Sequence, residues 1–145
     1  MTTVERVIKT TPQRVWNILE DGWLYPLWVV GASRMREVDN DWPRVGHKIH
    51  HSVGVWPALI NDDTEVLDCE PLKRLVLRAK GWPLLGEATV ALALQEQGAA
   101  TQVRMSEDAT AGPGRLVPLP LRAPGIQWRN TESLRRLAFL AERRP

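Results

Sequence analysis

The side chains best suited to catalysis or ligand binding include three histidines that lie within five positions of one another. His47, His50 and His51 fall in a segment that alternates polar and apolar residues, which favours a β-strand. In that strand His51 points to the same side as Ile49 and Val53, His47 shares that side, and His50 points away. An inward histidine could act as a general acid or base. It could equally be a core residue that one hydrogen bond satisfies.

A carboxylate and an amide are expected on the same inner surface. In the strand predicted at 101–108, Glu107 continues the inward alternation of Val103 and Met105. On the last helix, a rotation of about 100° per residue places Asn130 within the apolar stripe. Glu107 could then exchange protons, and Asn130 could polarise a carbonyl group. Alternatively, Glu107 only marks the fraying end of its strand and Asn130 binds a buried water.

No metal or cofactor is expected. His47 and His51 lie roughly 13 Å apart along a strand, too far for one ion, and His50 faces the opposite way. The single cysteine, Cys69, excludes a disulfide framework and a cysteine-rich zinc site. The chain carries neither a glycine-rich dinucleotide motif nor a phosphate loop.

The elements that must position these side chains are seven strands, two short helices and one long helix. Helices are predicted from Thr11-Pro12 and over 126–143, and 23–30, which contains Pro26, suits a short helix or a broken turn. The four prolines of 112–125 argue against a regular helix there. Period-two segments with short turns between them predict strands over 3–10, 32–39, 46–55, 61–69, 73–80, 87–95 and 101–108. This order predicts an α+β fold in which a curved antiparallel sheet wraps the long helix and leaves an internal cavity.

Length and composition fit one domain over residues 1–145, with 43% hydrophobic and 25% charged residues. The start shows no basic stretch followed by an apolar one, and no apolar run approaches the roughly 20 residues of a membrane span. We therefore expect a cytoplasmic protein without integral membrane contact. The last 31 residues are arginine-rich, but aromatic residues do not interleave on a basic strand, so nucleic acid is not an expected partner.

Tryptophan is unusually frequent, with seven residues against one Phe and one Tyr. Trp16 and Trp28 belong to the two short helices and are expected to be structural. Trp42, Trp56 and Trp82 each precede a proline at a strand end, which predicts the rim of a pocket. A tryptophan prefers such a boundary because its indole N–H needs a partner.

The last helix carries two aromatic residues on the side away from its apolar stripe, together with Arg135 and Glu132. Trp128 and Phe139 lie there. They could pack on the edge of the first strand, or they could form a self-association face and a homodimer.

Several motifs in order resemble the START-like (SRPBCC) superfamily of polyketide cyclases, dehydratases and pollen-allergen-type ligand-binding proteins. They are a first strand followed by Thr11-Pro12-Gln13-Arg14-Val15-Trp16, then Trp28, Val45-Gly46, Glu65-Val66-Leu67-Asp68-Cys69-Glu70-Pro71, Arg74-Leu75-Val76-Leu77 and the long closing helix. The resemblance implies a helix-grip fold: a curved seven-stranded antiparallel sheet around the C-terminal helix, with two short helices after the first strand. It also implies an apolar cavity for a lipid-like or polyketide-like molecule. The proline-rich segment 112–125 is then a candidate lid.

Three functions follow as alternatives. The first is binding of a hydrophobic small molecule without chemistry. The second is a cyclase- or dehydratase-type enzyme that uses His51 and Glu107 as general acid and base. The third is a protein-interaction module that uses the outer face of the last helix. The residues predicted to line the ligand site are His47, His51, Val53, Trp56, Leu77, Trp82, Leu92, Val103, Met105, Glu107, Leu119, Asn130 and Leu134.

Overall fold

The protein folds as seven β-strands and a long C-terminal helix, with three short helical segments near the N-terminus. The computed structural model describes residues 2–30, 32–53, 60–82, 86–111 and 119–143. The helical elements are α1 (Pro12–Leu19), the 3₁₀ turn η1 (Gly22–Leu24), α2 (Tyr25–Trp28) and α3 (Leu119–Arg143). The strands are β1 (Thr2–Ile8), β2 (Ala32–Val38), β3 (Lys48–Val53), β4 (Ile60–Glu70), β5 (Arg74–Trp82), β6 (Gly86–Gln97) and β7 (Ala100–Ala111).

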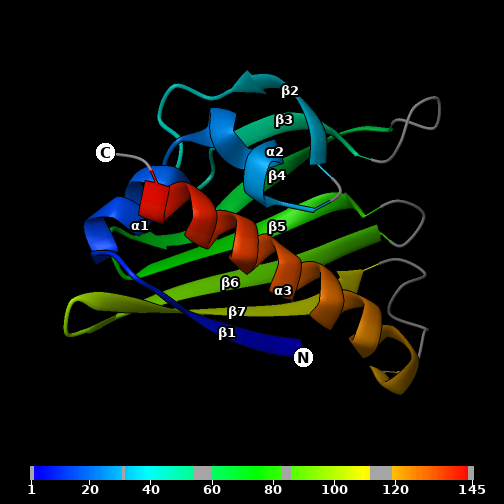
Figure 1. Cartoon of the computed structure of the whole chain (residues 1–145). Helices are drawn as coiled ribbons and strands as arrows, with labels where there is room; N and C mark the ends of the chain where they lie inside the picture. The colour runs from blue at the N-terminus through cyan, green and yellow to red at the C-terminus, as the bar shows by residue number, and fades with distance from the viewer. Residues whose placement is uncertain (1, 31, 54–59, 83–85, 112–118, 144–145) are drawn as a thin grey trace.

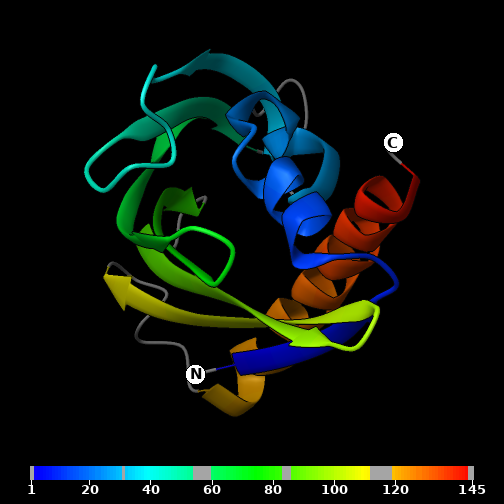
Figure 2. The ribbon, with the colours of Figure 1, turned by 90° about the vertical axis from the view of Figure 1, so that its left-hand side faces the viewer.

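All seven strands form one antiparallel sheet in the order β1-β7-β6-β5-β4-β3-β2. The six strands after the short helices form a meander, and β1 pairs with its last strand, β7. Figure 2 shows the sheet curving strongly, with the helices on its concave side. The predicted helix-grip architecture is confirmed.

Alternation along the strands separates the two faces of the sheet. In β6, Val90, Leu92 and Leu94 are buried while Ala93 and Gln95 are exposed. Leu92 lies opposite Leu75 of β5 on one side and Met105 of β7 on the other. This cross-strand register builds a continuous apolar inner surface, which is the arrangement that period-two patterning predicts.

The long helix crosses the concave side of the sheet (Figure 1). Its buried residues follow the predicted stripe: Ile126, Asn130, Leu134, Leu137 and Ala141. Its backbone comes close to β1, β7, α1 and α2. Among the described residues, no helix combines the length and apolar character that a membrane crossing requires.

The prediction that 112–125 excludes a regular helix is wrong for its last seven residues. The helix α3 begins at Leu119 and contains both Pro120 and Pro124. Pro120 lies in the first turn, where backbone N–H groups have no helical acceptor, so the proline lowers the stability of the helix only slightly. Pro124 costs one hydrogen bond to the carbonyl four residues earlier, a loss that the rest of a 25-residue helix absorbs. The remainder of the suggested lid, 112–118, lies outside the described residues.

Gly22 offers a test of packing where the short helices meet the sheet. A Cβ atom at Gly22 would lie 2.8 Å from Ile49 Cγ2, 2.8 Å from Val38 Cγ1 and 3.2 Å from Trp42 Cδ1. Because these atoms belong to packed side chains, we expect Gly22→Ala to lower the free energy of unfolding by about 1–3 kcal/mol. Urea denaturation would measure the change.

The matched control for Gly22→Ala is Gly125→Ala within α3. A Cβ atom at Gly125 meets nothing within 4 Å. The same substitution there replaces a poor helix former with a good one and should raise stability by about 0.5–1 kcal/mol. Equal effects at the two positions would contradict the packing argument.

Candidate functional site

Polar side chains gather in the otherwise apolar interior between the sheet and the helices. We call this set the interior polar cluster. It comprises His51 of β3, Thr64 of β4, Glu107 of β7, Tyr25 of α2, and Arg129 and Asn130 of α3. All except Arg129 are buried, and the Arg129 side chain is 20% exposed. Five elements that are distant in the sequence therefore supply one polar group of residues.

The first half of the cluster is built on His51. Its Nε2 atom lies 2.8 Å from Thr64 Oγ1, a distance that fits a hydrogen bond with either atom as the donor. The Tyr25 ring stacks on the imidazole, with centroids 5.4 Å apart and planes at 25°. Thr64 also lies close enough to the Tyr25 hydroxyl to lower its pKa. Thr64 therefore contacts the imidazole and influences the phenol.

Burial controls the protonation of this half. It lowers the pKa of His51 from 6.5 to about 4, although the charge of Asp63 opposes the shift. It raises the pKa of Tyr25, and the hydrogen bond with Thr64 opposes that shift. Both rings are therefore neutral at pH 7, because desolvation penalises the charged form.

The second half is an ion pair with an amide beside it. Arg129 Nη2 donates a hydrogen bond to Glu107 Oε2, and Glu107 is only 3% exposed. Burial raises the pKa of Glu107, whereas Arg129 and the nearby Asn130 amide lower it. The charges of Arg129 and Glu107 in turn act on the Tyr25 hydroxyl. The two halves are therefore close enough to form one electrostatic unit.

Two polar atoms of the cluster are buried without a hydrogen-bond partner in the described structure: His51 Nδ1 and Asn130 Nδ2. The Asn130 amide influences Glu107, but Nδ2 makes no hydrogen bond of normal length and angle. An unsatisfied buried polar group costs about 1–3 kcal/mol, so natural proteins rarely keep one without a reason. The amide nitrogen is a donor, and the neutral imidazole nitrogen can donate or accept according to its tautomer.

Most of the predicted lining residues occupy the interior. The structure buries His51, Leu77, Leu92, Val103, Met105, Glu107, Asn130 and Leu134. The backbones of Val53, Trp82 and Leu119 lie in β3, β5 and α3, but their side chains are not among those described. Trp56 lies outside the described residues.

The prediction that His47 points inward with His51 is wrong. His47 precedes β3, which begins at Lys48, and its side chain is 36% exposed. Its ring lies 3.9 Å from Asp39 and 3.9 Å from Asp41. The rings of His47 and His50 both approach Asp39, so the His47 side chain lies toward the outer side with His50.

The nearby His50 faces outward as predicted, with Nε2 3.4 Å from Asp39 Oδ1. The described residues contain no group of three or more His, Cys, Asp or Glu side chains placed to hold a metal ion.

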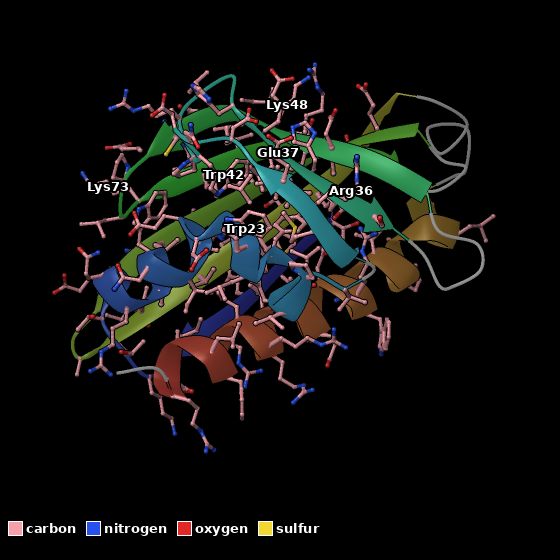
Figure 3. The ribbon with its side chains drawn as sticks, turned by 90° about the horizontal axis from the view of Figure 1, so that it is seen from above. Trp23, Arg36, Glu37, Trp42, Lys48 and Lys73 are labelled. Carbon is pink, nitrogen blue, oxygen red and sulfur yellow. The ribbon has the colours of Figure 1, made fainter. Side chains whose placement is uncertain are left out.

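Trp42 does not support the predicted pocket rim. It is buried beside Ile49 and the partly buried Val38 over Gly22, where the short helices meet β2 and β3 (Figure 3). Its indole Nε1 has no hydrogen-bond partner among the described residues. The Trp-Pro pair at this strand end therefore places its tryptophan in the hydrophobic core and not at a pocket opening. Trp16 and Trp28 are buried, as predicted for structural residues, whereas Trp23, which the sequence left unassigned, is exposed.

The outer face of α3 carries the two aromatic residues that the helical spacing places there. Trp128 is 68% exposed and Phe139 is 57% exposed, so most of each side chain faces away from the interior. Arg143 lies over the Phe139 ring at 5.0 Å from its centroid. This face remains a prediction for self-association.

Three residues of the cluster are not identified by the sequence patterns. Thr64 lies in a strand whose alternation does not show which side faces inward, and nothing in the sequence distinguishes Arg129 from the other arginines near the C-terminal end. Tyr25 is the only tyrosine in the chain and falls in an apolar segment. A hydroxyl in such a segment signals a buried polar group, and this signal could have identified Tyr25.

Comparison with known proteins agrees with the architecture. A family model described as polyketide cyclase / dehydrase and lipid transport matches residues 1–142. No curated protein gives a significant sequence match. Many solved structures share the fold.

One similar structure is protein NE0264 from Nitrosomonas europaea, with a TM-score of 0.74 and 19% identity over 97% of this chain and 92% of that chain. Ara h 8.0201 has a TM-score of 0.74 and 11% identity over 98% of this chain and 97% of that one. StfQ, a di-domain ARO/CYC protein from the steffimycin biosynthetic pathway, has a TM-score of 0.74 and 12% identity over 97% of this chain and 50% of that one. At these identities the likeness concerns the fold alone.

Proposed function

This chain belongs to the polyketide cyclase / dehydrase and lipid transport family, and on that premise we propose that it binds a hydrophobic small molecule between the sheet and α3. The bound molecule would contact the apolar inner surface of β5, β6 and β7. Its polar end would meet the interior polar cluster.

The observation that carries this proposal is the pair of unpartnered buried atoms, His51 Nδ1 and Asn130 Nδ2. They belong to β3 and α3, on two sides of the interior. A ligand with a carbonyl or hydroxyl group would satisfy them and remove their desolvation cost. A purely structural core would more economically place apolar residues at both positions.

A volume-filling substitution tests the proposal. Val90 of β6 faces inward and lies opposite Glu107 and Leu77 in the sheet register. If this region holds a ligand, the larger side chain of Val90→Phe should fill the ligand's space. It should lower the free energy of unfolding by less than about 1 kcal/mol and weaken probe binding at least about tenfold. A fluorescence titration with the neutral probe phenylnaphthylamine would measure the affinity, and urea denaturation would measure the stability.

The control carries the same change on the other face of the sheet. Val76 of β5 alternates with the buried Leu75 and Leu77 and is partly exposed. Val76→Phe should leave probe binding unchanged. The proposal fails if Val90→Phe costs the 1–3 kcal/mol typical of an overpacked core and leaves binding at the level of the control. Native mass spectrometry of protein purified from its own host would then identify a co-purified ligand.

A cyclase- or dehydratase-type enzyme is the second candidate, and neutral His51 favours it. The imidazole keeps one nitrogen unpartnered and shares the other with Thr64, so it could take a proton from a ligand. Glu107 is already paired with Arg129, so its carboxylate is less available to a ligand than the His51 imidazole. Returning the co-purified molecule to ligand-free protein distinguishes the candidates, because only an enzyme would change its mass with time and only an enzyme would lose that change in His51→Gln.

A further inference from the structure

We propose that the Glu107–Arg129 pair makes the interior site select uncharged, oxygen-bearing ligands and reject organic anions such as fatty-acid carboxylates. The inference rests on the proposed binding function and names the ligand class. Many apolar cargo molecules carry a carboxylate, so the distinction decides which group of natural ligands to search.

The charge inventory of the cluster supports this selection. Arg129 is its cationic side chain, and Glu107 already neutralises it through a direct contact. His51 and Tyr25 are held neutral by burial. The cluster as a whole is therefore close to neutral, and it offers no net positive charge to an incoming anion.

An anionic ligand would also meet repulsion. Glu107 is 3% exposed, so little water screens its carboxylate. A second carboxylate or a sulfonate beside it would have to displace Glu107 from Arg129 or lie unpaired in an apolar interior. Both outcomes are unfavourable, and built-in repulsion of this kind is a common source of specificity.

The two unpartnered atoms suit a neutral ligand. Asn130 Nδ2 can donate to a ketone, ester or phenol oxygen, and His51 Nδ1 can exchange a hydrogen bond with a hydroxyl or a carbonyl. Neither atom needs a charged partner. The ligand class that fits is a largely apolar molecule with carbonyl or hydroxyl oxygens and no ionised group.

Two fluorescent probes that share one skeleton test the selection at pH 7. Phenylnaphthylamine is uncharged, and anilinonaphthalene sulfonate (ANS) adds a sulfonate. We expect the wild-type protein to bind the neutral probe more tightly. Because a sulfonate also lowers hydrophobicity, the decisive quantity is the change of the ANS-to-neutral affinity ratio in Glu107→Gln. That ratio should rise about tenfold, since the substitution removes the negative charge that repels the sulfonate.

Two further variants serve as controls. Glu132→Gln makes the same chemical change on the outer side of α3, where Glu132 pairs with Arg135 and Arg136. It should leave the affinity ratio at the wild-type value. The double variant Glu107→Gln/Arg129→Gln removes both charges and should return the ratio to about that of the wild type. Circular dichroism would establish that each variant is folded.

Each outcome has a distinct meaning. If the wild-type protein binds neither probe, the proposed binding function fails. If it binds the neutral probe and folded Glu107→Gln keeps the wild-type ratio, the charge-selection inference fails while the binding function stands. If Glu107→Gln does not fold, competition on the wild-type protein decides. Methyl decanoate should displace the neutral probe at least about tenfold more effectively than decanoate below its micelle concentration, and equal displacement would overturn the inference.

Discussion

Arg129→Met is expected to lower the free energy of unfolding by about 3 kcal/mol at pH 7, which would be among the largest effects of any single substitution outside the apolar core. The variant keeps a long apolar side chain at this position, but it leaves the buried carboxylate of Glu107 without its guanidinium partner. Removing one member of a buried ion pair costs more than the pair itself contributes, because the remaining charge stays desolvated. Urea denaturation would measure the loss.

The pH dependence of that loss identifies its cause. Burial already raises the pKa of Glu107 above 4.5, and removal of Arg129 raises it further. A carboxyl group with a raised folded-state pKa contributes its full stability below its ordinary pKa and loses it as the pH rises through the folded value. The deficit of Arg129→Met relative to the wild type should therefore be small near pH 4 and largest around pH 7.

Two comparisons make the result specific to the buried pair. Arg135→Met breaks an ion pair with Glu132 on the exposed side of α3, and such surface pairs contribute only about 0.2–1 kcal/mol. Adding Glu107→Gln to Arg129→Met removes the isolated charge and should recover most of the lost stability. A deficit of Arg129→Met that is independent of pH and persists in the double variant would point to lost packing instead.

The inner and outer faces of most elements, though not of the strand that carries Thr64, could be predicted from periodicity alone. Strand alternation placed His51 and Glu107 in the interior, and helical spacing placed Asn130 inside and Trp128 outside, as the structure confirms. These predictions succeed because a residue on a regular element inherits its direction from its neighbours. His47 shows the limit, since it lies before β3 begins and its ring lies near Asp39 and Asp41 instead of in the interior.

The partners within the site could not be predicted in the same way. The contact between Arg129 and Glu107 joins α3 to β7, and that between His51 and Thr64 joins β3 to β4. Such pairs depend on how the sheet curves and on where the helix crosses it, and no local pattern records either. Arg129 adjoins Asn130 at the border of the buried stripe, so only tertiary packing distinguishes it from the solvated arginines of the same helix.

His51 leads to the second large effect, a loss of stability in mild acid. Its pKa is about 4 in the folded protein against an ordinary value of 6.5, because the buried imidazole resists a positive charge. A group with a lowered folded-state pKa contributes stability that is complete above the ordinary value and is lost as the pH falls toward the folded value. The histidine contribution should decline between pH 6.5 and pH 4, and the total loss should be about 3 kcal/mol.

The measurement is a difference between two stability curves, because other groups titrate in the same range. The raised pKa of Glu107 has the opposite effect on the free energy of unfolding, since a carboxyl group with a raised folded-state pKa gains stability as the pH falls. Subtracting the urea-denaturation curve of His51→Gln from that of the wild type cancels this contribution and isolates the imidazole. His47→Gln provides the control, because it removes a half-exposed ring and should leave the pH dependence nearly unchanged. A wild-type-minus-His51→Gln difference that stays flat from pH 6.5 to 4 would show that the imidazole takes up its proton without unfolding. In that case the His51 imidazole would be accessible to water in solution.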